Sequence, residues 1–232
     1  MKKLLLSACL CVIILSIGYG QTNFTRGEEL FMQNKPAEAL MYLENSVADD
    51  PAHAQAFLYL GIAYEQLGRN NEAIAVYRRI LNRAGNLAAA ISTNLANVYF
   101  QSGNLEYAGQ FYSQAITEDS LYASAYLGRA NTRIKTGALR EAVIDYESFL
   151  VLEPRSRKRP EIERMIAFIR AEFAAEERRR LLAEEAAREE AARRQRLLDE
   201  LAASLQSAAG DSKGLSSGAE NVESYDDEFE LE

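Results

Sequence analysis

One repeat period runs through the first two thirds of the sequence and constrains its fold more than any other feature. Five columns of similar residues recur at steps of 34 or 35 positions and share one single-residue insertion near 87–89. The columns hold small residues (Gly27, Gly61, Ala96, Ala130), turn formers (Asn34, Gly68, Gly103, Gly137), alanines (Ala39, Ala73, Ala108, Ala142), large residues (Leu43, Tyr77, Tyr112, Tyr146) and breakers (Pro51, Gly85, Ser120, Pro154). Such a period indicates stacked units, none of which can bury its apolar face alone.

The chemistry of the columns predicts two helices in each unit. A small residue in the first helix lets the second helix approach closely, and the alanine in the second helix completes that contact. The large residue four positions later fills the space between units. The Gly or Asn column ends the first helix with a left-handed residue, and the breaker column ends the second helix. We therefore expect an all-α fold, a solenoid of about four helix-turn-helix repeats over residues 21–156.

The best-defined unit carries a family resemblance. The run Leu60-Gly61-Ile62-Ala63-Tyr64, followed by Ala73 and Tyr77, resembles the tetratricopeptide repeat. The resemblance covers about residues 20 to 156, and it departs from the family pattern at Arg133, where the family usually has Tyr. It implies a non-catalytic α-solenoid that binds peptide or protein segments in a concave groove.

In this family the groove is lined from fixed positions on each first helix. Carried over, those positions are Leu58, Tyr59, Ile62, Gln66, Thr93, Asn94, Asn97, Gln101, Leu127, Asn131 and Lys135. Apolar side chains mixed with amides suit hydrogen bonds to an extended backbone. Some relatives bind a carboxylate terminus with paired Lys, Arg and Asn, but only Asn94 fits that pattern here, so we do not expect carboxylate capture. The alternative is that the apolar members pack against neighbouring helices while Asn97 and Asn131 stay solvated.

The first twenty residues have the layout of a secretory signal peptide. A basic start, Met1-Lys2-Lys3, precedes the apolar run Leu4–Ile17, and Gly18-Tyr19-Gly20 supplies small residues before Gln21. The apolar run is short for a bilayer-spanning helix of about 20 residues. We expect cleavage before Gln21, export to the periplasm or cell envelope of a bacterium, and no membrane span afterwards. Two alternatives are an uncleaved anchor and lipidation at Cys9, in a run that resembles a lipobox.

The residues after the repeats predict a capping helix at 157–173. Pro160 suits the first turn of a helix, and apolar residues then keep helical spacing: Ile162, Met165, Ile166, Ile169 and Phe173. The basic run Arg155–Arg159 is interpreted as a solvated linker, with docking of an anionic partner or membrane surface as the alternative.

Residues 174–208 predict an extended charged helix. They are mostly Ala, Glu, Arg and Leu, contain no Gly or Pro, and place Glu four positions before Arg several times, as in Glu176 and Arg180. They lack a sustained apolar seam, so we expect a solvated single helix rather than a long coiled coil. A short stripe near its end offers self-association or pairing with a partner helix: Leu197, Leu198, Leu201 and Leu205. Residues 209–232 are acidic and aperiodic, which predicts a disordered tail.

The composition argues against catalysis, cofactors and nucleic acid. The net charge is −8, whereas nucleic-acid binding needs a basic face. The two cysteines, Cys9 and Cys11, lie within the predicted signal, and His53 is the only histidine. Metal sites, cofactor sites and nucleophilic triads are therefore not expected. His53, just after a breaker, is expected in a loop or helix cap.

Together these features predict a non-enzymatic scaffold or adaptor of the cell envelope, whose partner is a protein or peptide. The alternative is a structural spacer or oligomerisation protein that acts through the long charged helix.

Overall fold

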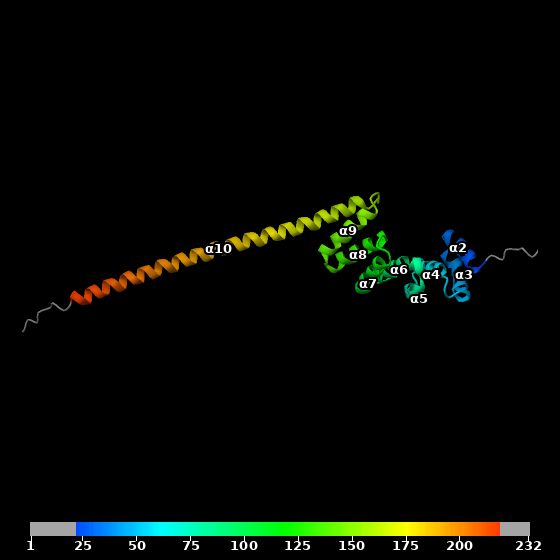
Figure 1. Ribbon diagram of the computed structural model, residues 1–232, viewed down its shortest axis with the longest axis horizontal. Coiled ribbons are helices and arrows are strands. Elements are labelled where there is room, and N and C mark those ends of the chain that lie inside the picture. The colour runs from blue at the N-terminus through cyan, green and yellow to red at the C-terminus, as the bar shows by residue number, and fades with distance from the viewer. Residues whose placement is uncertain (1–21, 219–232) are drawn as a thin grey trace, which may run out of the picture. The chain divides into compact units, whose positions relative to one another are not determined.

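The computed structural model describes residues 22–218, and this part of the chain contains helices only (Figure 1). In chain order the α-helices are α2 (Asn23–Met32), α3 (Pro36–Asp49), α4 (Ala54–Gln66), α5 (Asn70–Ile80), α6 (Ala88–Gln101), α7 (Leu105–Glu118), α8 (Ala123–Thr136), α9 (Leu139–Leu152) and α10 (Arg159–Gly218). Two short 3₁₀ turns, Leu81–Arg83 and Gly85–Leu87, lie between α5 and α6. The predicted signal peptide at 1–20 and residues 219–232 of the predicted tail lie outside the described residues.

The first eight helices form four antiparallel pairs, which confirms the all-α repeat prediction. Each first helix packs on its own second helix, and α2, α4, α6 and α8 also contact one another in sequence. The single-residue insertion near 87–89 falls at the 3₁₀ turns, which separate the second pair from the third. Helix α2, at 10 residues, is the shortest of the eight.

The turn column behaves as predicted. Asn34, Gly68, Gly103 and Gly137 have φ values of 58°, 71°, 78° and 79°, all left-handed. The residue after each of them donates its backbone N–H to the carbonyl five positions earlier, as Arg69 does to Tyr64 at 2.8 Å. This is the Schellman arrangement, which satisfies carbonyls at the end of a helix. Four first helices therefore end in the same way because one position per repeat tolerates positive φ.

The small-residue column permits very close helix contact. A Cβ added to Gly61 would lie 2.1 Å from the Tyr77 ring, and one added to Gly27 would lie 2.8 Å from the Leu43 side chain. Both contacts lie within a repeat. In contrast, the Tyr112 ring occupies the space beside Gly128 of the following repeat, 2.2 Å from where a Cβ would be. The large residues therefore fill the space inside a helix pair in some repeats and the space between units in another. The sequence pattern alone did not distinguish these two roles.

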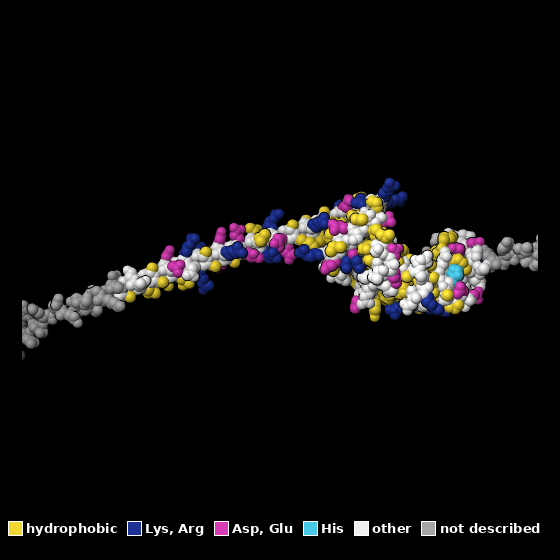
Figure 2. All heavy atoms as spheres, in the orientation of Figure 1, with side chains coloured by type: hydrophobic (Ala, Val, Ile, Leu, Met, Phe, Trp, Pro, Cys, Tyr) yellow, Lys and Arg dark blue, Asp and Glu magenta, His cyan; other side chains and the backbone are white. Residues whose placement is uncertain are grey.

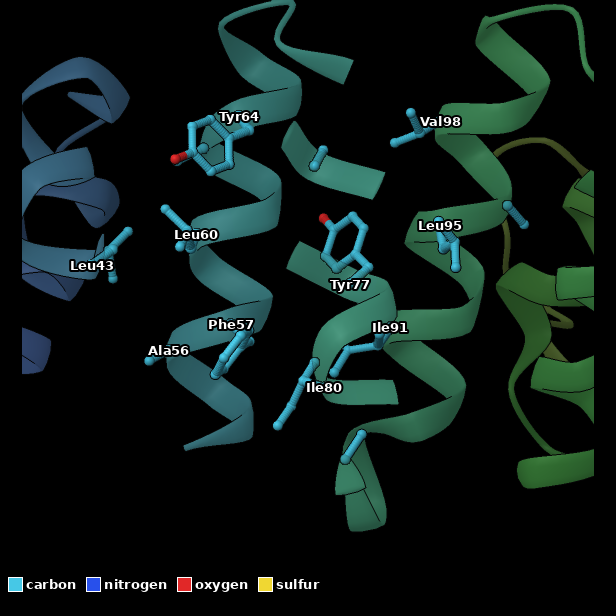
Figure 3. Packing of buried hydrophobic residues seen from close by; sticks show 14 of the residues in the cluster. Leu43, Ala56, Phe57, Leu60, Tyr64, Tyr77, Ile80, Ile91, Leu95 and Val98 are labelled. Carbon is cyan, nitrogen blue, oxygen red and sulfur yellow. The ribbon is translucent and has the colours of Figure 1, made fainter. Parts of the chain in front are cut away.

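One apolar core runs through the first three helix pairs and reaches Ala125 at the start of α8. Figure 3 shows Tyr77 between α4 and α6, close to Leu95 and on the opposite side of α4 from Leu43. All four alanines of the second-helix column are fully buried. Because each pair completes the core of its neighbour, the repeats are stable only as an array.

The first turns of α10 cap the array. Ile162, Ile166 and Ile169 are buried, as predicted for a capping helix. The Arg159 side chain donates to the carbonyls of Leu150 and Pro154 at 2.8 and 2.9 Å, so this member of the basic run fastens the end of α9 and is not a solvated linker residue.

The described residues from Arg170 to Gly218 belong to a second structural unit. Figure 2 shows side chains of both charge signs along this part of α10. Arg180 pairs with Glu177 at 2.6 Å and Glu184 at 3.6 Å, rather than with the predicted Glu176. The structure also continues the helix to Gly218, about ten residues beyond the predicted end at 208. The glycines after residue 208 each cost only about 1 kcal/mol inside a helix, and residues 209–218 contain no proline, which would break it. The helix can therefore continue through them.

Candidate functional site

The predicted groove positions lie on three first helices that neighbour one another, and we call their side chains the first-helix face. Helix α4 contacts α6, and α6 contacts α8. Gln66, Gln101, Asn131 and Lys135 are exposed, and Leu58, Tyr59, Ile62, Asn94, Asn97 and Leu127 are half-buried. Thr93 is the exception, because its side chain is buried and faces the core rather than solvent.

The apolar members on α4 serve mainly as packing residues. Leu58, Tyr59 and Ile62 pack against the buried core. The Tyr59 ring also stacks with Phe31 of α2, at a centroid distance of 5.1 Å, and with Phe24 at 6.1 Å. These contacts agree with the packing alternative for the α4 side chains.

The amides of the third and fourth repeats have fixed partners instead of being merely solvated. The Tyr112 hydroxyl on α7 donates to Asn97 Oδ1 at 2.6 Å, and the Tyr146 hydroxyl on α9 donates to Asn131 Oδ1 at 2.8 Å. Both pairs span 15 residues and join the second helix to the first helix of the same repeat. Each tyrosine binds the amide oxygen Oδ1 and not the amide nitrogen, so the Nδ2 hydrogens stay available to donate.

In the second repeat, a carboxylate rather than an amide accepts the hydroxyl of the buried tyrosine. Ile62 stands where the later repeats have Asn97 and Asn131, so the Tyr77 hydroxyl donates to Glu65 Oε1 at 2.5 Å. Burial raises the pKa of the Glu65 carboxyl, and the Tyr77 hydrogen bond opposes that rise. Burial and, secondly, the Glu65 charge raise the pKa of the Tyr112 phenol. Neighbouring Gln66 was a predicted groove position, whereas Glu65 was not.

A small cavity lies at the α8 end of the first-helix face. Its volume is about 90 Å³, and α8, α9, the residue before α10 and the first turns of α10 supply its lining: Leu127, Asn131, Tyr146, Lys158, Glu161, Ile162 and Met165. Burial and, secondly, the nearby Glu161 charge raise the pKa of the Tyr146 phenol. Two lining residues were predicted groove positions, whereas Lys158 and Glu161 were missed because their helix was assigned only a capping role.

Lys135 and His53 have local partners. The Lys135 Nζ lies 5.0 Å from the centroid of the Phe100 ring, a cation–π distance. His53 is the N-cap of α4, where its Nδ1 accepts the Ala56 N–H at 3.0 Å. The prediction of a cap histidine is therefore confirmed.

The departure from the repeat pattern at Arg133 has a structural reason. Asp145 of α9 is 1% exposed and accepts hydrogen bonds from Arg129 at 2.9 and 2.8 Å and from Arg133 at 2.5 Å. Arg133 therefore replaces an aromatic contact with an ion pair between the two helices of the last repeat.

Two family models match the repeat array. Residues 24–89 match one model of the tetratricopeptide repeat, and residues 89–120 match a second. The chain carries tetratricopeptide repeats. The fourth pair, α8 and α9, lies outside the matched residues, and its left-handed turn and its Tyr146–Asn131 pair repeat the geometry of the third.

Solved structures of MamA share the fold of this chain. A crystal structure of MamA is 19% identical, with a TM-score of 0.57, and the match covers 64% of this chain and 84% of that chain. MamA from Desulfovibrio magneticus RS-1, residues 41 to the end, is 16% identical, with a TM-score of 0.57 and coverage of 66% and 84%. The first repeat domain of Spaghetti (RPAP3), bound to an HSP90 peptide, is 27% identical, with a TM-score of 0.47 and coverage of 52% and 93%. The comparison with curated proteins gave no match.

Two features are absent from the described residues. Among residues 22–218, no helix has the length and apolar character needed to cross a membrane. The same part of the chain has no group of three or more His, Cys, Asp or Glu side chains placed to hold a metal ion.

Proposed function

We propose that this chain is a non-enzymatic protein-interaction module whose first-helix face binds an extended peptide segment of a partner protein. The observation that carries the proposal is the pair of tyrosine-held amides, Asn97 and Asn131. Each amide accepts a buried tyrosine hydroxyl and keeps its own donors for a ligand. An extended peptide presents backbone carbonyls as acceptors, so two oriented donors on neighbouring helices match its chemistry.

Orientation of the amides before binding favours affinity. A free asparagine side chain loses rotamer freedom when it binds, and that loss opposes association. Tyr112 and Tyr146 are buried and hold Asn97 and Asn131 in the absence of a ligand. The face therefore presents its donors with little further ordering.

The cavity beside α8 supplies the end of the proposed site. Leu127, Ile162 and Met165 give it apolar walls, while Lys158 and Glu161 add one charge of each sign. Its volume of about 90 Å³ suits a small apolar side chain of the peptide. Asn131 belongs both to the cavity and to the amide pair, which supports continuity between the two parts of the site.

The test is the double variant Asn97→Ala with Asn131→Ala, measured against the partner recovered by crosslinking from native envelopes. We expect a loss of affinity of about fivefold to 150-fold, since two hydrogen bonds of about 0.5–1.5 kcal/mol each are removed. Gln110→Ala, at an exposed amide on the second helix α7, is the matched control. Unchanged affinity in a folded double variant would exclude this face.

A second double variant separates the presence of the amides from their orientation. Tyr112→Phe with Tyr146→Phe keeps both amides and both rings but removes the hydroxyls that hold the amide groups. A smaller loss than in the asparagine variant is expected. If the two double variants lose affinity equally, the contribution of the amides to binding depends on their orientation by the tyrosines. If the tyrosine variant loses no affinity, the amides bind the peptide without being held in place beforehand.

For location, we propose export to the cell envelope with cleavage before Gln21. The support is the signal-like sequence of residues 1–20, with its basic start and its short apolar run. Mass spectrometry of the native N-terminus tests this proposal. A retained Met1 would favour the anchor, and a lipid on Cys9 would favour attachment to a membrane surface.

The spacer function is a second candidate, favoured by the leucines of the charged helix. Leu197, Leu198, Leu201 and Leu205 are 52–66% exposed in the described structure. Light scattering of the full chain, beside Leu201→Glu with Leu205→Glu, tests this candidate. An oligomer that the double variant dissociates supports a spacer, and a monomer in both supports the adaptor.

A further inference from the structure

The two central first helices carry a single charged residue. Helices α4 and α6 are fully described, and Glu65 is the only Asp, Glu, Lys or Arg in either of them. The rest of the face on these helices consists of apolar side chains, amides and hydroxyls. The only formal charge that α4 and α6 themselves offer to a ligand is therefore negative.

The Glu65 carboxylate is half-buried and has no cation of its own. Its hydrogen-bond donor is the Tyr77 hydroxyl, at 2.5 Å. The arginine one turn further along, Arg69, instead pairs with Glu72 at 2.9 Å and lies 4.6 Å from the centroid of the Tyr64 ring. Within residues 22–218, no Lys or Arg forms an ion pair with Glu65.

Such a carboxylate opposes folding. Removing a charge from water costs free energy unless a counter-ion replaces the lost hydration. A glutamine at the same position would still accept the Tyr77 hydrogen bond and would avoid that cost. Residues that act against stability in this way concentrate at functional sites, where the cost is offset by what they bind.

The neighbouring residues leave the carboxylate free to bind. Tyr77 occupies one lone pair of Oε1, so Oε2 and the remaining lone pairs can accept from a ligand. Asn94 opposes the rise in the pKa of the Tyr77 phenol, and Asn97 on α6 is held by Tyr112 on α7. The carboxylate is thus set among donors suited to the backbone of the same ligand.

We infer that Glu65 binds a basic side chain, Lys or Arg, of the peptide that occupies the first-helix face. The inference rests on the proposed function and assigns the class of its ligand. A Lys ammonium or Arg guanidinium would form charge-assisted hydrogen bonds with the carboxylate, which are about twice as strong as neutral ones. The site thus selects a cationic side chain in the middle of an extended segment, the opposite preference to capture of a carboxylate terminus.

The experiment uses the full chain and four pools of acetylated, amidated heptapeptides. All positions are randomised except the central one, which is fixed as Lys, Arg, Gln or Glu, and binding is measured by fluorescence polarisation. Wild-type protein is expected to bind the Lys and Arg pools about tenfold to a hundredfold more tightly than the Gln pool, and the Glu pool least. Glu65→Gln is expected to bind the Lys, Arg and Gln pools equally.

Two controls make the result specific. Glu44→Gln removes another carboxylate that accepts a tyrosine hydroxyl, from Tyr64 at 2.6 Å, but on the second helix α3, so the basic preference should persist. The melting temperature of Glu65→Gln should equal or exceed that of the wild type. A lower melting temperature, with no change in peptide preference, would assign Glu65 a structural role and overturn the inference.

The remaining outcomes separate the two proposals. Equal wild-type binding of all four pools, weakened by Asn97→Ala with Asn131→Ala, overturns the Glu65 assignment and leaves the peptide site in place. Binding that neither the asparagine variant nor Glu65→Gln alters places the peptide elsewhere and overturns the first-helix face. Absence of binding to every pool overturns both.

Discussion

The repeat array and the charged part of α10 are both helical, but different interactions hold them. In the array, every helix pair buries its alanine and its large side chain, and the first three pairs share one continuous core. From Ala174 to Ala209 every described side chain is exposed, so α10 depends there on helix propensity and on ion pairs such as Arg180–Glu184. Stability therefore depends on contacts between neighbouring helices in the array and on local sequence in the exposed part of α10.

The largest expected effect breaks the array at its buried ion pair. Asp145→Ala leaves Arg129 and Arg133 without the carboxylate that pairs with both of them. Removing one partner of a buried pair costs about 3–5 kcal/mol, and the partial exposure of the two arginines places this case toward the lower end. Urea unfolding of the variant measures the loss.

A change of volume in the core should come next. Ala73→Leu adds bulk at a fully buried position on α5, and overpacking of this kind costs about 1–3 kcal/mol. Arg188→Leu on the exposed helix is the matched change in the other unit and should cost far less. Thermal unfolding of both variants checks the comparison, and equal losses would contradict it.

Glu65→Gln should move stability in the opposite direction. Because burial raises the folded-state pKa of Glu65 above its ordinary value of 4.5, the folded chain binds more protons than the unfolded chain between the two values. Wild-type stability should therefore fall as pH rises through that raised pKa, relative to Glu65→Gln. Urea midpoints of both proteins between pH 4 and pH 8 measure the difference. Parallel pH profiles would show that the carboxyl is not desolvated.

The smallest effect is expected at an ion pair of α10. Arg180→Ala removes contacts with Glu177 and Glu184 from a fully exposed helix, and such surface changes alter stability by less than about 0.5 kcal/mol. Circular dichroism should show local loss of helix without a shift in the unfolding of the array. A shift of the main transition would mean that the two regions fold as one.

Features that depend on a single repeat position were predictable from the sequence. The turns at Asn34, Gly68, Gly103 and Gly137 need positive φ, and that requirement appears directly as a column of permissive residues. The alanine and large-residue columns predicted the helix pairing in the same way, because each column also depends on one position per repeat.

Features that depend on two helices meeting were not predictable in the same way. The Tyr112–Asn97 bond joins residues 15 apart on different helices, and only the packed geometry brings the hydroxyl to the amide. Thr93 matched a groove position yet is buried, because position in a repeat does not determine how closely the next helix approaches. Glu65 became a candidate only when the structure showed no ion pair between it and any Lys or Arg among residues 22–218.

The close contacts between glycine and tyrosine also restrict how these positions can change during evolution. The Tyr77 ring fills the volume that any side chain at position 61 would need, and the Tyr112 ring does the same at position 128. Replacing either glycine first creates a clash, and shrinking either tyrosine first leaves a void in the core. In descendants of this sequence, positions 61 and 77, and positions 112 and 128, should therefore change together or not at all.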